Sequence, residues 1–168
     1  MRSHLIDNKT KELFIYNTLT KDENDKVILG THTKTYDKKT GKDLGKRKIP
    51  LFGDTEKIIA EELAKKITNI HGLIFWDYTK NTFISGSEVN SWLTRINEKF
   101  KITDKRFSTH VLRHTRITRW KEQGIDMAVI QYWAGHVDGS SMTMGTYFSL
   151  QEEFIEKEYK KLKEATNE

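Results

Sequence analysis

Hydrophobic and polar residues alternate through the first third of the chain, which is typical of half-buried β-strands. Residues 12–19 and 26–33 both follow this pattern and are rich in aromatic and β-branched side chains, with the turn-like stretch 21–25 between them. A third short apolar segment covers residues 46–52, and residues 34–45 before it are polar and contain two glycines. The pattern predicts a three-stranded antiparallel meander whose last hairpin has a basic tip.

After Pro50 the apolar positions recur with the spacing of helices. Asp54 is predicted to cap the first helix and Ser87 the second. The first helix has its apolar face at Ile59, Leu63, Ile67 and Ile70, and the second at Val89, Trp92, Leu93, Ile96 and Phe100.

Three more helices are expected in the second half. One covers residues 109–122, and the next is capped by Asp126 and ends at Gly135. That second helix should point Met127, Ile130 and Ala134 inward, and a last helix over 150–164 has an apolar stripe of Ile155, Tyr159 and Leu162. The fold class predicted is therefore α+β, mostly helical, with a small N-terminal sheet.

Composition narrows the class of protein. The chain has 168 residues, of which 36% are hydrophobic and 32% charged, as expected for one polar globular domain. It contains no apolar run long enough to span a membrane and no secretory signal at its start, so a cytoplasmic location is expected. The absence of cysteine excludes a disulfide scaffold, a thiolate zinc site and a cysteine nucleophile.

Positive charge is concentrated in two segments. Residues 34–48 hold seven Lys or Arg against two Asp, and residues 95–121 hold nine Lys or Arg against two acidic residues. Because the whole chain carries only +5, everything outside these segments is acidic on balance. This distribution indicates a polyanionic partner, with nucleic acid first, although solvated lysine-rich loops are the simpler alternative.

Arginine and histidine gather in the stretch STHVLRHTRITRW, residues 108–120. His110 and His114 share a helix face, but the glutamate of an HExxH zinc site is missing and no carboxylate-rich segment accompanies them. The helical pair 109–134 has the outline of a helix-turn-helix, yet its second helix offers only Gln131 for reading bases, which favours ordinary packing. His110 and Arg113 also share a face, where an arginine fork and a histidine suit a phosphate.

Several motifs in order resemble the tyrosine recombinases, or phage integrases. THVLRHT is similar to the family's H-x-L-R-H-T box, WAGH to its L-G-H box, and TMGTYF to the segment that carries its nucleophile. Upstream, HTKT and GKRKIPL are similar to the family's β-hairpin. The resemblance covers roughly residues 5–148.

The resemblance implies a DNA strand transfer through a 3′-phosphotyrosyl intermediate, needing no metal, cofactor or ATP. Its implied partner is double-stranded DNA, on which the family assembles as tetramers. Tyr147 matches the nucleophile, His110 the proton acceptor, and Arg113 and His136 the groups on the phosphate. Lys34 matches the lysine that protonates the leaving oxygen, with Lys42 as the alternative, while Arg116 and Arg119 are candidate contacts to the DNA backbone.

One family motif is missing from these residues. The first catalytic arginine lies in a TG-x-R-x-x-E box before the sheet, and neither this box nor the N-terminal DNA-clamping domain is found. Residues 1–168 are therefore expected to be a partial catalytic domain. Two functions remain open. The chain is either part of an integrase, with low activity when these residues act alone, or a truncated module that binds DNA without cutting it.

Overall fold

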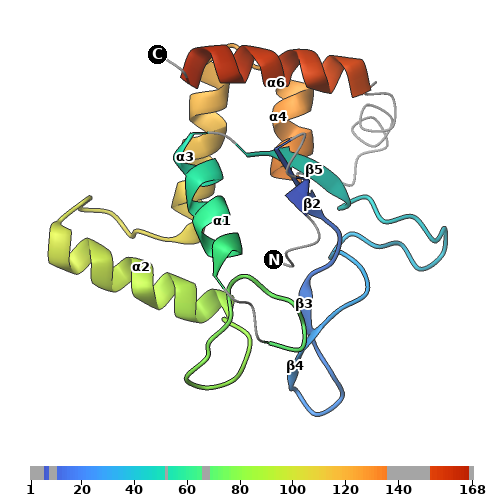
Figure 1. Cartoon of the computed structure of the whole chain (residues 1–168), viewed down its shortest axis with the longest axis vertical. Helices are drawn as coiled ribbons and strands as arrows, with labels where there is room; N and C mark the ends of the chain where they lie inside the picture. Colours follow the sequence, from blue (N-terminus) through green and yellow to red (C-terminus); the bar gives the residue numbers. More distant parts are fainter. Residues whose placement is uncertain (1–5, 8–10, 52, 66–68, 136–151, 167–168) are drawn as a thin grey trace.

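The computed structural model describes residues 6–7, 11–51, 53–65, 69–135 and 152–166. Two small antiparallel sheets lie on one side of a group of helices (Figure 1). No helix among the described residues is long and apolar enough to cross a bilayer.

The sheets confirm the antiparallel expectation but pair differently from the predicted meander. β2 (Glu12–Ile15) lies between β1 (Ile6–Asp7) and β5 (Arg47–Pro50), whereas β3 (Leu19–Lys21) pairs only with β4 (Val27–Leu29). The predicted strand 12–19 is thus divided in two, because the chain changes partners between β2 and β3. Pro50, which lacks an N–H, pairs with Glu12 at the edge of the three-stranded sheet, where proline is tolerated.

The helices of the described chain are α1 (Asp54–Ala64), α2 (Gly86–Phe100), α3 (Thr109–Glu122), α4 (Met127–Ala134) and α6 (Glu152–Thr166). α4 begins and ends as predicted, because the Asp126 side chain accepts the Ala128 N–H and Gly135 closes the helix in the left-handed conformation. Met127 was wrongly predicted to point inward: it is 45% exposed, because the buried face of α4 is formed by Val129, Ile130, Trp133 and Ala134.

Two predicted helix starts were wrong. α1 begins after Gly53, so Asp54 is its first residue rather than its cap. α2 is capped by Ser85 instead of Ser87, because Ser85 and Glu88 form a reciprocal capping box. Ser87 has no glutamate at the spacing with which it could form such a box. The predicted extension of α1 to Ile70 also fails, since the helix ends at Ala64 and Ile70 is 93% exposed.

The main core lies between α3, α4 and α6. Trp120, Val129, Ile130, Trp133 and Leu162 are buried together, and the two indole rings lie 5.3 Å apart. α6 lies across the ends of α3 and α4 (Figure 1), so Leu162 is buried in the chain's own core and Ile155 and Tyr159, partly buried, pack against it.

A second, smaller core of Leu13, Leu51 and Ile59 lies between the three-stranded sheet and α1. The Tyr159 hydroxyl on α6 donates to the carbonyl oxygen of Leu51 at 3.2 Å and so ties the two cores together. Burial, followed by the nearby carboxylates of Glu56 and Glu12, raises the pKa of Tyr159, which keeps this hydroxyl a donor. The buried Glu158 carboxylate accepts the backbone N–H of Asp126 at 2.9 Å, which fixes α6 against the start of α4.

Replacing Leu162 with alanine should test whether α6 is an integral part of this core. Leu162 is fully buried, so Leu162→Ala should lower the free energy of unfolding by about 2–5 kcal/mol through lost burial and the cavity left behind. Lys160→Ala, on an exposed position of the same helix, is the control and should change it by no more than about 0.5 kcal/mol. Urea denaturation measures both, and an equal, small effect of the two substitutions would show that α6 does not contribute to the core.

Candidate active site

Six of the eight predicted site residues fall within the described chain, on two elements. His110, Arg113, Arg116 and Arg119 lie on α3, and Lys34 and Lys42 lie in the connection between β4 and β5. His136 and Tyr147 lie outside the described residues.

α3 is anchored at both ends and exposed between them. At its start, the side-chain oxygen of Asn90 on α2 accepts the Thr109 N–H at 3.0 Å and faces the Thr109 hydroxyl at 3.2 Å. Toward its end, Trp120 is the one buried side chain that α3 contributes to the core. His110 and Arg113 are both exposed and, three residues apart, share one face of this fixed helix.

The exposure of α3 explains how one helix can carry so many cationic side chains. Burying cationic side chains without partners would be costly, but most basic residues of α3 remain in water. An exposed arginine fork beside a histidine can hold two oxygens of a phosphate and exchange a proton with a neighbouring hydroxyl. The geometry therefore suits a large anion that lies on the surface rather than a small one enclosed in a pocket.

Arg116 and Arg119, which the sequence analysis treated alike, have different environments. The Arg116 guanidinium is half-buried and lies 5.0 Å from the centre of the Trp120 ring. Burial, and then repulsion from Arg119, lowers the pKa of Arg116, although an arginine stays charged near neutral pH. Arg119 is exposed, so it is the better placed of the two to reach a DNA backbone.

Both arginines line a cavity of about 610 Å³ between α3, the end of β5 and the start of α1. The rest of its lining includes Leu13, Leu51 and Ile59 of the second core and Trp120 of the main core. Arg116 thus lies where the two cores meet, which makes packing part of its role.

Lys34 is exposed and stands in a turn whose backbone is tightly held. The carboxylate of Asp43 accepts the Thr33 N–H at 3.0 Å and also the Thr33 hydroxyl. Its side chain is 4% exposed, and burial alone would raise the pKa of Asp43. The hydrogen bonds from Thr33 and the Gly45 N–H, helped by the charge of Lys46, outweigh burial, so the pKa of Asp43 lies below 3.8.

Gly45 packs against the residues on either side of Lys34. A Cβ atom at Gly45 would lie only 2.6 Å from the Thr33 Cβ and from the Thr35 Oγ1, so no larger residue fits there without movement. The Thr33 and Thr35 hydroxyl oxygens are 3.2 Å apart on this surface. Lys34 therefore projects from a turn that Asp43 and Gly45 hold from one side.

Lys42 stands in the outer part of the same connection. Its carbonyl accepts the Asp37 N–H at 2.8 Å, and its side chain is exposed. Asp37 organises this outer turn by accepting the Thr40 hydroxyl at 2.7 Å and the Lys39 N–H at 2.8 Å. Both candidate lysines are thus accessible, but only Lys34 lies between residues that contact the buried Asp43 and Gly45.

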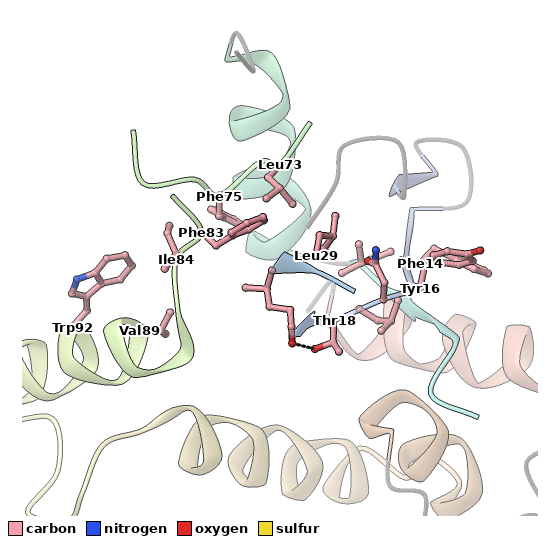
Figure 2. A pocket seen from close by; sticks show the side chains of 14 residues that line it. Phe14, Tyr16, Thr18, Leu29, Leu73, Phe75, Phe83, Ile84, Val89 and Trp92 are labelled. Atoms are coloured by element: carbon pink, nitrogen blue, oxygen red, sulfur yellow. Dashed lines mark hydrogen bonds between the residues drawn. The ribbon is translucent and has the colours of Figure 1, made fainter. Parts of the chain in front are cut away.

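A second, mostly apolar pocket near the sheets carries different chemistry. Figure 2 shows a pocket of about 450 Å³ between side chains of β2 to β4, such as Phe14 and Leu29, and side chains of residues 73–92, such as Phe83 and Trp92. Among the described residues, its lining includes none of the predicted site residues. An apolar pocket offers no charge to a phosphate, so the candidate site is the basic surface of α3 and the Lys34 turn.

Sequence reasoning assigned no role to Asp43, which lies outside the matched segments, or to Arg47, which lies inside the matched segment GKRKIPL. Asp43 fixes the Lys34 turn, and Arg47 on β5 binds the carbonyl oxygens of Gly45 and Trp133. The available signals were an acidic residue inside a basic segment and the arginine of GKRKIPL.

Three comparisons with known proteins bear on this site. The model of the phage integrase family matches residues 7–153, so the chain belongs to the phage integrase family. Structures of the Tn1549 transposon integrase in complex with circular intermediate DNA match 96% of the chain with 18% identity and a TM-score of 0.62. The crystal structure of XerA recombinase matches 95% of the chain with 18% identity and a TM-score of 0.56.

These two structures share the fold of this chain, which is that of a tyrosine recombinase catalytic domain. The chain spans about half of each, 52% of the Tn1549 integrase chain and 49% of XerA. No curated protein matches the sequence.

Replacing Asp43 with asparagine should show how strongly the Lys34 turn is held. Asp43→Asn removes the charge that accepts two hydrogen bonds from Thr33, so the free energy of unfolding should fall by about 1–3 kcal/mol at pH 7. Because folding lowers the pKa of Asp43, its contribution is complete above the usual pKa of 3.8 and is lost as the pH falls through the lowered value. Urea denaturation from pH 7 to pH 2 should therefore show the difference between variant and wild type shrinking below about pH 4.

Asp37→Asn is the control for this measurement, because Asp37 makes similar hydrogen bonds in the exposed outer turn. Hydrogen bonds from Thr40 and Lys39 lower the pKa of Asp37 as well, but they are exposed to water, so Asp37→Asn should lower the free energy of unfolding by less than Asp43→Asn. Equal destabilisation by both substitutions would contradict the special role assigned to Asp43.

Proposed function

We propose that this chain carries out site-specific DNA recombination, with Tyr147 as the nucleophile. The observation that carries the proposal is the exposed basic face of α3, where His110 and Arg113 stand side by side on a helix fixed at both ends. Family membership and the DNA complexes solved for the Tn1549 integrase support DNA as the substrate.

In this mechanism the Tyr147 hydroxyl attacks a DNA phosphorus and passes its proton to His110. A 3′-phosphotyrosyl bond forms as the bond to the 5′-oxygen breaks, and Lys34 gives that oxygen its proton. Arg113 and His136 stabilise the charge on the nonbridging oxygens. Attack by the 5′-hydroxyl of another strand reverses these steps and joins the new DNA.

Lys34 is preferred to Lys42 as the proton donor in this proposal. A general acid must be held close to the oxygen that it protonates, and the turn of Lys34 is fixed by Asp43 and Gly45. Lys42, in the exposed outer turn, is assigned to the DNA backbone together with Arg119.

A second candidate function is DNA binding without strand cleavage. The 168 residues contain no TG-x-R-x-x-E box, so only Arg113 matches an arginine of the family's phosphate clamp. Losing one preorganised charge contact of this kind typically costs on the order of 10²–10³ in rate. A chain acting alone in this way would hold DNA but cut it very slowly.

Covalent attachment to nicked DNA separates the two functions. A nick next to the cleavage point lets the 5′-hydroxyl fragment diffuse away, so a tyrosine nucleophile stays trapped on the DNA. We expect a very slow or undetectable adduct from the 168 residues alone and a faster one when a segment with the arginine box precedes them. Denaturing gels of the protein–DNA adduct provide the measurement.

Tyr147→Phe should abolish the adduct, and Tyr78→Phe, at a tyrosine that is 55% exposed, is the matched control that should retain it. An adduct that survives Tyr147→Phe would refute the nucleophile. DNA binding with no adduct from either length of protein would establish the second candidate function instead.

Salt dependence tests whether the basic segments bind DNA through its phosphates. Binding should weaken steeply with salt, and Arg113→Ala should reduce the slope of log Kd against log salt by about one, because one phosphate contact is lost. Lys21→Ala, which removes a cation paired with Asp25 outside both basic segments, should leave the slope unchanged. A flat salt dependence of the wild-type chain would rule out a phosphate-bound complex.

A further inference from the structure

The Arg47 side chain joins two parts of the molecule that are far apart in the sequence. Its Nη1 donates to the carbonyl oxygen of Gly45 at 2.8 Å, and its Nε donates to the carbonyl oxygen of Trp133 at 3.1 Å. One guanidinium on β5 therefore bonds both to the connection that contains Lys34 and to the last turn of α4.

At the α4 end, the guanidinium takes up the space that a side chain would need. Gly135 has φ 68° and ψ 39°, a left-handed conformation that favours glycine. A Cβ atom there would lie 2.5 Å from the Cζ atom of Arg47. The last carbonyls of a helix carry partial negative charge, so a cation at this point is favourable as well as close. His136 is the next residue in the sequence.

At the hairpin end, the Gly45 carbonyl that Arg47 binds belongs to the same residue that packs against Thr33 and Thr35. Those two residues flank Lys34. A continuous set of contacts therefore leads from the Lys34 turn through Gly45 and Arg47 to Gly135.

We propose that Arg47 is a positioning residue that couples the turn holding Lys34 to the C-terminal end of α4. Arg47 does not touch the reacting atoms in this role; it fixes the backbone of two segments relative to one another. That Lys34 and His136 act on DNA rests on the proposed function, whereas the coupling itself is a property of the fold.

Arginine is needed at this position because of its shape. Its planar fork has several donors at fixed angles, so it can bind two carbonyl oxygens at once, whereas lysine presents a single compact charge. Arg47→Lys keeps the charge and should lose the simultaneous contact.

Tyr132 supplies a matched control. Its hydroxyl accepts the Lys48 N–H at 3.1 Å, so it ties α4 to the same strand but makes no bond to Gly45. Tyr132→Phe should loosen α4 on β5 without reaching the Lys34 turn.

Amide hydrogen exchange, followed by NMR on the whole 168-residue chain, tests the coupling without DNA. The reporters are the Thr33 N–H, bonded to Asp43, and the Gly135 N–H, bonded to the Tyr132 carbonyl. Arg47→Lys should speed exchange about tenfold at both reporters, and Tyr132→Phe at Gly135 alone. The Val89 N–H, in the first turn of α2, should stay unchanged in both variants.

Faster exchange at only one reporter in Arg47→Lys would overturn the coupling. If that variant does not fold, Gly135→Ala gives the same test from the other end, because its methyl group displaces the guanidinium. It should then speed exchange at Thr33, and an unchanged Thr33 would overturn the proposal.

The rate of adduct formation gives a second measurement. A residue that only stabilises the fold would slow attachment to ordinary and to sulfur-substituted DNA equally. Replacing the 5′-bridging oxygen of the DNA with sulfur gives a leaving group that departs as a thiolate and needs no proton from Lys34. Arg47→Lys should slow attachment to ordinary DNA more than to sulfur-substituted DNA, and equal slowing would overturn a role through Lys34. If the wild-type protein forms no adduct at all, in either length, the proposed function fails and the exchange measurement alone decides the coupling.

Discussion

The structure depends on how the helical part is fixed to the edge of the small sheet. β5 is the outer strand of that sheet, and an exposed strand edge leaves backbone groups without partners. Here α4 provides a partner for one of them, because the Tyr132 hydroxyl accepts the Lys48 N–H, and the Arg47 side chain donates to the Trp133 carbonyl oxygen. The same arrangement satisfies the last turn of the helix, so one contact serves both elements.

The way in which α3 packs on the core also explains where the positive charge lies. The core of α3, α4 and α6 takes Trp120 and the partly buried Ile117 from α3, so most cations of that helix, Arg116 excepted, lie in water. Apolar packing through Trp120 fixes α3, and the hydrogen bonds of Asp43 fix the turn that contains Lys34. Preorganised cations on a fixed surface bind a polyanion without first having to be ordered, which is the property that phosphate chemistry requires.

Much of this arrangement could be predicted from the sequence, for reasons visible in particular residues. The left-handed end of α4 followed from Gly135. The spacing of Ile155, Tyr159 and Leu162 predicted an apolar stripe that must be buried, but left open whether on this chain's core, as observed, or on another chain. Local signals failed where two candidates competed, as with Ser85 and Ser87 at the start of α2. They also failed where pairing is set by distant partners, as in the separation of β2 from β3.

The supporting residues were the hardest to predict. Asp43 lies within a lysine-rich segment, and only the burial of its side chain against Thr33 distinguishes it from Asp37 in the outer turn. Arg47 contributes its charge to the basic segment, but its bond to Trp133 crosses 86 positions of sequence, which no local pattern reveals. Motif matching identified the groups proposed to react, whereas the groups that hold them required the three-dimensional structure.

The central claim is that one particular tyrosine of this chain becomes bonded to DNA. Its most direct test is mass spectrometry of the peptide that stays attached to a nicked DNA duplex after proteolysis, using the chain together with a preceding segment that carries the arginine box. The account predicts a 3′-phosphate on Tyr147. A phosphate on Tyr132 or Tyr159, or a DNA-bound protein from which no linked peptide is ever recovered, would contradict it.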